Sequence, residues 1–592
     1  MCGIFGYVGS DQDAAAVVLR ALKKLEYRGY DSWGVAVASD GSAFLERRVG
    51  KIGEAVAALP ASPIGLGHTR WATHGGVTQP NAHPHLDCAG RLALVHNGIV
   101  TNYRELRADL IQTGHRFGSE TDTEVVVHLL EDCLSQTPAG PDQLAVATIA
   151  AFRQLEGLNA IAVLDVDSGQ LAAAKNGSPL VLGWGEHGNM LASDYSALLE
   201  HTRRVTFVED GQAVLVSREG SRVFDVVSGR GVEAAIAEVE WEAAATELNG
   251  YPDYMTKEIH EQPAVLRQIA DSWRHHACRL AARLRDADDI FLVGCGTAGH
   301  AALAAQYLFA RIAGRRVTFA TGSEFSYLRD FVGEDALVVA LSQSGETIDV
   351  IDSVKAARER GARVAAMVNV EGSTLWRMAD ERVPLGAGPE RCVLATKSFS
   401  AKLAILLMTA YELTGKIDVG EALVRQTADE IERLLTDHRR DLIRGIAEDI
   451  YGRDHLFVIG RGPSYPLALE AALKVKEASY VHAEGFAGDE LKHGVIALIE
   501  PGTPCLVLAP RDETYEDIMS GAMEVKARGA LLIGVSPEPD EAFDHHIPIA
   551  DVGPATAMLS AVPAQLLGYY LALRRGHDPD KPRNLAKSVT VK

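Results

Sequence analysis

The chain has 592 residues, of which 47% are hydrophobic and 23% are charged, close to the average of globular proteins. The length is that of several domains, and the composition excludes wholesale disorder or a fibrous fold. The formal net charge of −21, without any run of basic residues, argues against nucleic acid and anionic membrane surfaces as partners.

Signals for export or membrane insertion are not found in the sequence. No stretch approaches eighteen consecutive apolar residues. The first ten residues, MCGIFGYVGS, lack the basic segment of a signal peptide. The seven cysteines are scattered, without a CxxC pair or a zinc-site spacing, so we expect reduced thiols and no metal site. A cytoplasmic protein is predicted.

Residues 1–238 are predicted to form an α+β domain. An apolar period indicates a helix over 12–25 that ends at the turn near Gly29, and a capping box at 121–124 opens a second helix. Short strands follow, separated by Gly, Asn and Asp, which favours antiparallel pairing. They cover residues 160–166, 179–184, 204–208, 212–217 and 222–227.

Residues 239–265 are rich in acids, aromatics and turn formers and are interpreted as a linker. Beyond them, strand-like and helical segments alternate, and a long helical stretch is expected over 398–444. This alternation predicts βαβ units with parallel sheets. We expect two such α/β domains and a short C-terminal tail. Their boundaries are 266–440, 441–583 and 584–592.

The two α/β domains are predicted to be copies of each other. HLFVIGRGPS (455–464) repeats DIFLVGCGTA (289–298) at an offset of 166 residues. LVLAPRDETYEDI repeats VVALSQSGETIDV, with Thr347 matching Thr514 at an offset of 167. A nearly constant offset across two separate motifs indicates an internal duplication.

The glycines of the first repeated motif also fit a dinucleotide site, because GCGTAG (294–299) follows a strand and matches G-x-G-x-x-G. The second copy reads GRGPSY, which breaks the third glycine, and the acidic residue expected roughly twenty positions later is absent. We interpret the glycines as a tight strand-to-helix turn facing a sugar pocket, and expect no nucleotide cofactor.

Cys2 is the first candidate for chemistry. A small residue after the initiator Met allows Met removal, and the free α-amine, with a reference pKa of about 8, can then serve as base for the thiol nucleophile. Position alone would favour an inert cysteine. The motifs that accompany it change this interpretation. They are CGIFGYVG, YRGYDS (27–32), GHTRWATHG (67–75), NAHPH (81–85), HNGIVTNY (96–103) and GSETDTE (118–124).

In this order, the motifs resemble the class II glutamine amidotransferases, a family of N-terminal-nucleophile enzymes with a four-layer αββα fold. The resemblance implies L-glutamine as substrate, Cys2 as nucleophile, and Asn97 with the N–H of Gly98 as oxyanion hole. Arg70 suits the carboxylate of glutamine and Asp122 its ammonium group. The implied glutamine-binding residues are Arg70, Trp71, Thr73, His74 and Asp122.

The strongest signal of the second half is LSQSGET (341–347), between an apolar strand and a helix. Its hydroxyls, amide and glycine at a helix N-terminus form an anion cradle without a basic side chain, although a polar turn has the same composition. The motif resembles the phosphosugar-binding SIS (sugar isomerase) domain, and the duplication matches a domain that occurs twice. The residues implied to bind the sugar phosphate are Thr297, Ser342, Gln343, Ser344, Thr347, Val393 and Ala586.

A third cluster, LEAALKVKEASYVHAEGFAGDELKHG (469–494), places Lys474 and Glu477 on one helix face and His493 on a turn after it. Spacing alone would favour a salt-bridged helix surface. With the tail PRNLAKSVTVK (582–592), the cluster completes a resemblance over the whole chain. The family that it resembles transfers the amide nitrogen of L-glutamine to fructose 6-phosphate and isomerises the product to glucosamine 6-phosphate.

The resemblance implies a role for each residue of this cluster and of the tail. Lys587 forms a Schiff base with the C2 ketone, and Glu477, with Lys474 as charge partner, moves the proton between C1 and C2. His493 opens the furanose ring and comes from the neighbouring subunit, so a homodimer is implied. Trp71 gates a dry channel that keeps ammonia unprotonated between the two sites. No metal or organic cofactor is implied.

Three positions depart from the family pattern. Ala298 and Ala395 stand where serine is usual, and Asp489 stands where glycine is usual. Two lost hydroxyls and one added carboxylate near the sugar could retune the acceptor. One alternative is therefore a paralogue that aminates or isomerises another ketose phosphate. Another is a non-catalytic phosphosugar sensor, which the residues of the third cluster and the tail lysine disfavour.

Overall fold

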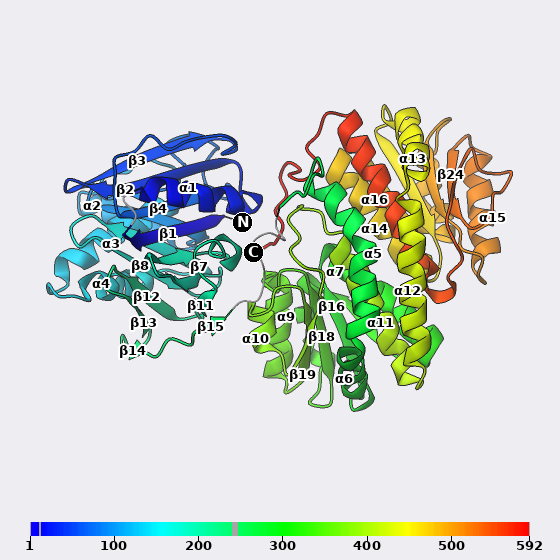
Figure 1. The fold of residues 1–592 in the computed structure, drawn as a ribbon, viewed down its shortest axis with the longest axis horizontal. Helices are drawn as coiled ribbons and strands as arrows, with labels where there is room; N and C mark the ends of the chain where they lie inside the picture. The colour runs from blue at the N-terminus through cyan, green and yellow to red at the C-terminus, as the bar shows by residue number, and fades with distance from the viewer. Residues whose placement is uncertain (1, 11–12, 239–246, 591–592) are drawn as a thin grey trace. The chain divides into compact units, whose positions relative to one another are not determined.

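The computed structural model describes residues 2–10, 13–238 and 247–590, and the chain divides into two compact units (Figure 1). The first unit comprises residues 1–245 and 586–592, and the second comprises residues 246–585. Each unit is built around hydrophobic clusters of its own.

Two antiparallel sheets form the first unit. The larger sheet has the strand order β15-β11-β9-β10-β1-β4-β2-β3, and the smaller has the order β14-β13-β12-β8-β7-β6-β5. The strands are β1 (Gly3–Gly9), β2 (Ser32–Ser39), β3 (Ser42–Val49), β4 (Ile64–Arg70), β5 (His85–Leu86), β6 (Leu92–Gly98), β7 (Asn159–Asp165), β8 (Gln170–Lys175), β9 (Val181–Trp184), β10 (Gly188–Ala192), β11 (Arg204–Phe207), β12 (Gln212–Val216), β13 (Ser221–Asp225), β14 (Gly231–Val232) and β15 (Ala237–Glu238).

The two sheets pack face to face, with helices on their outer faces. Ile4 and Leu66 of the larger sheet share one core cluster with Leu164 of the smaller sheet. The helix α1 packs on the larger sheet, and α3 and α4 pack on the smaller sheet (Figure 1). The strand β7, NAIAVLD, is buried along its whole length because both of its faces are covered. The predicted four-layer αββα fold is confirmed. The helices are α1 (Ala14–Leu25), α2 (Tyr103–Gln112), α3 (Thr123–Gln136) and α4 (Gln143–Phe152).

The structure adds α2 and α4 to the two predicted helices. The helix α2 has Leu110 as its only buried residue, so it shows no apolar period. The helix α4 is apolar at nearly every position. The capping box of α3 is half formed. The N–H of Glu124 donates to Thr121 Oγ1 at 3.3 Å, but the Glu124 carboxylate accepts from the N–H groups of Gly118 and Ser119, both at 2.7 Å.

Two five-stranded parallel sheets form the second unit, with the orders β17-β16-β18-β19-β20 and β22-β21-β23-β24-β25. In each sheet, the second strand along the chain lies at one edge, followed by the first, third, fourth and fifth strands. The predicted duplication and the parallel pairing are therefore confirmed. We call these halves the first copy and the second copy. Their strands are β16 (Ile290–Gly294), β17 (Thr318–Thr321), β18 (Leu337–Ser342), β19 (Arg363–Val368), β20 (Glu381–Pro384), β21 (His455–Gly460), β22 (His482–Ala487), β23 (Pro504–Leu508), β24 (Leu531–Ser536) and β25 (His545–Pro548).

One shared core joins the two copies. Leu292 and Val339 of the first sheet belong to the same cluster as Val458 and Leu506 of the second. The helix α14 packs against α7 and α16 in this core, and α12 packs against α5 (Figure 1). The helices are α5 (Tyr254–Ser272), α6 (Arg274–Arg285), α7 (Gly296–Leu308), α8 (Gly322–Phe325), α9 (Ile348–Glu359), α10 (Thr374–Met378), α11 (Lys397–Leu413), α12 (Ile417–Leu434), α13 (Asp437–Ile450), α14 (Ser464–Ser479), α15 (Tyr515–Lys526) and α16 (Thr556–Arg574).

Part of the predicted linker is a helix. The helix α5 follows Asp253, whose carboxylate caps its first turn, and its apolar positions, such as Ile259, are fully buried. Charged and aromatic residues between these positions conceal the helical period, and Pro263 adds a false turn signal. The interpretation of 254–265 as a linker is therefore wrong. Residues 239–246 lie outside the described residues.

The segment over 398–444 is also more divided than predicted. It belongs to three helices, α11, α12 and α13, which short turns separate. The segment between α14 and His493 contains the unexpected strand β22, which pairs with β21, followed by a 3₁₀ helix over Gly488–His493. Small residues in HAEGFA give β22 a weak strand signal.

One helical segment among the described residues, Gly553–Arg574, is long and apolar enough to cross a membrane by length and composition. Within it, 94% of the apolar window is buried inside the protein. The segment contains α16, which packs against α13 and α14. Its apolar character is that of a core helix.

Candidate active sites

Cys2 directly precedes β1. Its Sγ accepts a hydrogen bond from the N–H of Trp71 at 3.2 Å. Its carbonyl oxygen accepts from Asn97 Nδ2 at 3.0 Å and from Arg28 Nε at 3.2 Å. Burial raises the pKa of the Cys2 thiol, and the positive charge of Arg70 opposes part of that shift. The thiol therefore needs a base before it can act as a nucleophile.

Asn97 and Gly98 end β6 beside Cys2. His68 Nε2 lies 3.1 Å from Asn97 Oδ1 and 3.0 Å from a main-chain carbonyl oxygen. Burial lowers the pKa of His68 to about 3, so the ring is neutral, and Nε2 carries its proton because both neighbours are acceptors. This donor holds the Asn97 amide with Nδ2 toward Cys2. Gly98 has a φ of +136°, and a Cβ there would lie 2.2 Å from the carbonyl oxygen of Leu158, so a side chain does not fit.

The structure brings together every residue that sequence analysis assigned to glutamine chemistry. They line one cavity in the first unit. The cavity is also lined by Thr590 of the C-terminal tail and by His83 and His96. The assigned residues are Cys2, Arg70, Trp71, Thr73, His74, Asn97, Gly98 and Asp122.

The two charged residues assigned to glutamine binding are both buried. Arg70 ends β4, and its guanidinium donates to the carbonyl oxygens of Gly75 at 3.2 Å and Gly76 at 3.1 Å. It therefore supports the loop that carries the cavity residues after β4. Asp122 directly precedes α3, and its carboxylate accepts from the N–H of Val100 at 2.9 Å. The cavity thus presents one cation and one anion, as a free amino acid requires.

Sequence analysis assigned no role to the histidines behind this cavity. His68 fixes Asn97, and His96 bridges Thr123 Oγ1 at 3.0 Å and Asn159 Oδ1 at 2.9 Å. Both histidines lie inside the quoted motifs GHTRWATHG and HNGIVTNY. Their partners come from other strands and from α3, so only the folded chain shows what they hold.

The predicted phosphate cradle connects β18 to α9. Ser342 Oγ accepts from the N–H of Gly345 at 3.0 Å and lies 3.1 Å from Thr347 Oγ1, while Ser344 Oγ accepts a main-chain N–H of the loop at 3.1 Å. Gly345 has a φ of +68°, and a Cβ there would lie 2.0 Å from Ser373 Oγ. The loop therefore gathers hydroxyls and N–H groups at a helix N-terminus, where the helix dipole favours an anion.

Lys474, on α14, lies in a buried charge network and not on a helix surface. Its Nζ is 2.6 Å from Glu477 Oε2 and 3.5 Å from Glu470 Oε1, and it donates to Thr297 Oγ1 at 3.1 Å. His300 Nδ1 lies 2.8 Å from Glu470 Oε2. Burial alone would lower the pKa of Lys474, but the Glu477 and Glu470 carboxylates raise it above its usual value. The ammonium group therefore stays charged.

Glu470 and His300 were not expected at this site. Burial raises the pKa of Glu470, but Lys474 and His300 outweigh that effect, and the net shift is downward. Glu470 lies four residues before Lys474 on α14, so the helical spacing was an available signal. His300 comes from α7 in the other copy, and no local pattern indicates it.

His493 is exposed at the end of the 3₁₀ helix over Gly488–His493. Asp489, in the same helix, forms ion pairs with Arg461 and with Lys492, the latter at 3.1 Å. The unusual carboxylate at this position is thus compensated by two cations.

The remaining residues assigned to the sugar site are more dispersed. Gln343 lies in the cradle, where its carbonyl oxygen accepts from the N–H of Asn369 at 3.1 Å. Val393 is buried, and its N–H donates to the carbonyl oxygen of Asp580 at 3.0 Å. Ala586 and Lys587 belong to the first compact unit, whereas the cradle belongs to the second. Their roles in sugar binding and catalysis stay predictions.

Comparison with known proteins gives matches over the whole chain. A glutamine amidotransferase domain matches residues 1–218, and a SIS domain matches residues 283–411 and 449–575. Over the full length of both chains, the protein is 40% identical to the glutamine–fructose-6-phosphate aminotransferase [isomerizing] of Pyrococcus horikoshii and 42% identical to that of Thermus thermophilus. A solved C-terminal domain of glucosamine-fructose-6-phosphate aminotransferase from Francisella tularensis matches 57% of this chain and all of that chain, with 29% identity and a TM-score of 0.52.

Fold, sites and domain matches together define a glutamine amidotransferase domain joined to two SIS domains. The amidotransferase match contains Cys2 and every residue assigned to glutamine chemistry, and the SIS matches contain the cradle and α14. Because relatives are about 40% identical over the full length of both chains, the chain belongs to the glutamine–fructose-6-phosphate aminotransferase (isomerizing) family. It is an enzyme of the aminotransferase class.

Proposed function

We propose that the protein transfers the amide nitrogen of L-glutamine to fructose 6-phosphate and isomerises the product to glucosamine 6-phosphate, releasing L-glutamate. The observation that carries this proposal is the ion pair between the buried Lys474 and Glu477, at 2.6 Å. Placing a charged lysine in the interior is costly, even when a carboxylate pairs with it. A phosphosugar sensor needs no such pair, and neither does a glutaminase.

In the glutaminase half-reaction, the Cys2 thiol attacks the carboxamide carbon of glutamine. Its proton passes to the α-amine that removal of Met1 exposes, and from there to the departing ammonia. Asn97 Nδ2 and the Gly98 N–H stabilise the oxyanion that forms on the carbonyl oxygen. A water then hydrolyses the Cys2 thioester and yields glutamate. The fixed orientation of Asn97 by His68 supports this assignment, because a donor that needs no reorganisation stabilises the transition state most.

In the sugar half-reaction, Ser342, Ser344 and Thr347 hold the phosphate at the N-terminus of α9. The Lys587 amine condenses with the C2 ketone and loses water, and ammonia then displaces the lysine at C2. Glu477 takes a proton from C1 and returns a proton to C2, which converts the ketose imine into the aldose amine. Lys474 supports this step because its ammonium group lies 2.6 Å from Glu477 Oε2 and holds that carboxylate in place.

The proposal includes a homodimer in which His493 opens the sugar ring in the neighbouring subunit. The exposure of His493 at the end of its 3₁₀ helix supports a role toward another chain. Mixing His493→Ala and Lys587→Ala proteins tests it. If the two residues serve one site from different subunits, each mixed dimer regains one intact site, and about a quarter of the wild-type activity returns after random reassortment of subunits. Recovery of no activity in proven mixed dimers would contradict the shared site.

A channel for ammonia and a cytoplasmic location complete the proposal. Trp71 lines the glutaminase cavity, which supports its role as the gate at that end of the channel. The scattered cysteines, without a disulfide among the described residues, support a reducing compartment. Trp71→Ala should uncouple the two reactions, so that glutamate forms faster than the amino sugar.

The departures Ala298, Ala395 and Asp489 bear on one part of the proposal, the identity of the acceptor sugar. Compensation of Asp489 by Arg461 and Lys492 removes one reason to expect another acceptor. Incubation with glutamine and fructose 6-phosphate, with the product identified by mass and NMR, tests the proposal directly. A preference for another ketose phosphate would replace it with the paralogue.

Two variants separate the half-reactions. Cys2→Ala should abolish glutamine-dependent synthesis and leave sugar isomerisation intact. Borohydride treatment with fructose 6-phosphate should trap an adduct at Lys587, and an adduct at another lysine would contradict that assignment. Lys587→Ala should lose the adduct but keep basal glutaminase activity.

A further inference from the structure

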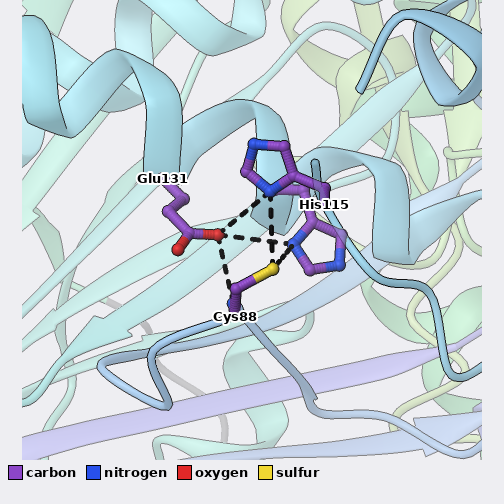
Figure 2. Close-up of side chains that lie close together, drawn as sticks. Cys88, His115 and Glu131 are labelled. Atoms are coloured by element: carbon purple, nitrogen blue, oxygen red, sulfur yellow. Dashed lines mark hydrogen bonds and ion pairs between the residues drawn. The ribbon is translucent and has the colours of Figure 1, made fainter. Parts of the chain in front are cut away.

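Four side chains with metal-binding atoms converge in the first unit, on the side of the smaller sheet covered by α3 (Figure 2). Cys88 lies in the turn after β5, His115 lies between α2 and α3, and His128 and Glu131 lie on one face of α3. One atom of each residue lies within 4.8 Å of the corresponding atoms of the other three. Neither half-reaction uses this cluster.

The spacing of these atoms is that of a tetrahedral metal site. Cys88 Sγ is 3.5 Å from His115 Nδ1 and 3.6 Å from His128 Nδ1. Glu131 Oε2 is 3.3 Å from His115 Nδ1 and 3.4 Å from His128 Nδ1. Ligands bound tetrahedrally to zinc at about 2.0–2.3 Å lie about 3.3–3.6 Å from one another. Four edges of the cluster therefore already have the lengths of a zinc tetrahedron.

The outward-facing nitrogens of both imidazoles point toward carboxylates. His115 Nε2 is 3.0 Å from Asp132 Oδ1, and His128 Nε2 is 3.9 Å from Glu124 Oε1. For His115, the carboxylate on Nε2 places the ring proton there and leaves Nδ1 with a free lone pair, which is the arrangement of metal-bound histidines. His128 Nε2, at 3.9 Å, is too far from Glu124 for a hydrogen bond. The His115 lone pair then faces the Glu131 carboxylate, which is also an acceptor. A cation between them resolves this conflict.

We propose that Cys88, His115, His128 and Glu131 bind a structural Zn²⁺ ion. Zinc accepts this mixture of one thiolate, two imidazoles and one carboxylate in four-coordinate geometry. All four positions are taken by protein, so the ion has no open position for water or substrate and serves structure, not catalysis. The cysteine spacing gives no sign of the site because its ligands come from three separate segments and only one is a cysteine.

The location of the cluster gives the ion a defined task. It would tie the turn at Cys88 and the segment at His115 to α3, whose first residues follow Asp122 of the glutamine cavity. The ion would thus hold the start of α3 against the smaller sheet. Loss of zinc should therefore lower the thermal stability of the first unit and raise KM for glutamine. The kcat for isomerisation should change less, because Lys474 and Glu477 lie in the second unit.

Metal analysis of the full-length protein tests the proposal. The background is Cys2→Ala, which removes the catalytic thiol as a competing ligand. After dialysis, about one zinc per chain should remain, and Co²⁺ replacement should give tetrahedral d–d bands with thiolate charge-transfer absorption. Cys88→Ser should lose the charge-transfer absorption. Cys133→Ser, on the same helix as two of the ligands but outside the cluster, is the matched control and should change nothing.

A second variant addresses the partner of His115. Asp132→Asn should weaken zinc affinity about 10- to 100-fold while the four ligands stay in place. The exposed Asp109→Asn on α2 is its control. If Cys88→Ser does not fold, His115→Gln takes its place in the same measurement. Absence of saturable zinc and cobalt binding by the folded protein overturns the proposal, as does zinc binding that Cys88→Ser and His115→Gln both leave unchanged.

Discussion

The two SIS copies have the same strand order but carry different side chains at equivalent positions. In the first copy, the loop before α9 carries the hydroxyls of the cradle. In the second copy, the loop before α15 carries Asp512, whose carboxylate accepts from the N–H of Thr514 at 2.9 Å and from its Oγ1 at 2.5 Å. An anion of the protein itself thus takes the helix N-terminus where the first copy offers room for a phosphate.

The helices α7 and α14 differ in the opposite sense, because here the second copy carries the charged residues. Residues 166 positions before Glu470, Lys474 and Glu477 are Ala304, Leu308 and Arg311, so the first copy has no equivalent charge network. On the proposed function, the first copy holds the sugar phosphate and the second copy carries the proton-transfer group. Thr297 and His300 of the first copy contact Lys474 and Glu470 of the second copy, which links the two halves.

The largest expected effect comes from breaking the proton-transfer group. Glu477→Gln should lower amino-sugar synthesis about 10²- to 10⁴-fold, because it removes the general acid–base group but keeps its shape. Basal glutaminase activity should not change. The measurement is product formation by coupled assay beside glutamate release. Arg311→Gln, at the equivalent position of the first copy, is the control, and an equal loss in that variant would contradict the division of labour.

The cradle gives the next largest effect. Thr347→Ala should raise KM for fructose 6-phosphate about ten- to a hundredfold, because a hydrogen bond to a charged phosphate contributes about 1.5–3 kcal/mol. Thr514→Ala, its partner in the duplication, should leave KM unchanged, since Asp512 already occupies that helix end. Steady-state kinetics of both variants gives the KM for fructose 6-phosphate that tests this prediction. A rise in KM for Thr514→Ala would mean that the second copy also binds the sugar phosphate.

Much of this comparison was accessible from the sequence. Strand alternation, parallel pairing and the duplication follow from local patterns of apolar residues and glycine, and the motifs around Cys2 predicted residues that the fold brings into one cavity. The helix α5 was missed because acids and Pro263 interrupt its period, and β22 because its residues are small.

The supporting contacts of the sites were not accessible in the same way. His68 holds Asn97 across two sheets, and His300 reaches Glu470 from the other copy, so both depend on pairs far apart in the chain. The spacing of Lys474 and Glu477 was compatible with a surface ion pair, and only burial distinguishes the network. Sequence patterns report local structure, whereas these contacts are decided by packing.

Stability gives a smaller but distinctive effect. The pKa of Glu470 in the folded protein lies below the ordinary value of 4.5, because Lys474 and His300 outweigh the cost of burial. The stabilisation is therefore complete above about pH 4.5 and is lost as the pH falls through the folded pKa. Glu470→Gln should unfold with a flatter pH dependence in this range and be less stable at neutral pH by about 1–3 kcal/mol.

Urea unfolding of the second unit at several pH values measures this effect. Glu524→Gln, which removes a half-buried partner of Lys492, is the control and should change stability by less than about 1 kcal/mol. A pH profile for Glu470→Gln as steep as that of the wild type would show that the carboxylate is not held ionised by its partners.

The smallest expected effect concerns Ala298, where the two copies differ by one hydroxyl, because Ser464 stands at the equivalent position of the second copy. Ala298→Ser restores a donor at the start of α7. A water can bridge the same gap in the wild type, so the gain is less than a full charged hydrogen bond. We expect KM for fructose 6-phosphate to fall by about tenfold or less, with kcat unchanged, if this sugar is the native acceptor.

If the pocket is tuned to another ketose phosphate, Ala298→Ser leaves a poor fructose 6-phosphate reaction poor. Values of kcat/KM for both forms against several ketose phosphates separate these outcomes, and Ser464→Ala, which should not alter KM, shows that the effect belongs to the first copy.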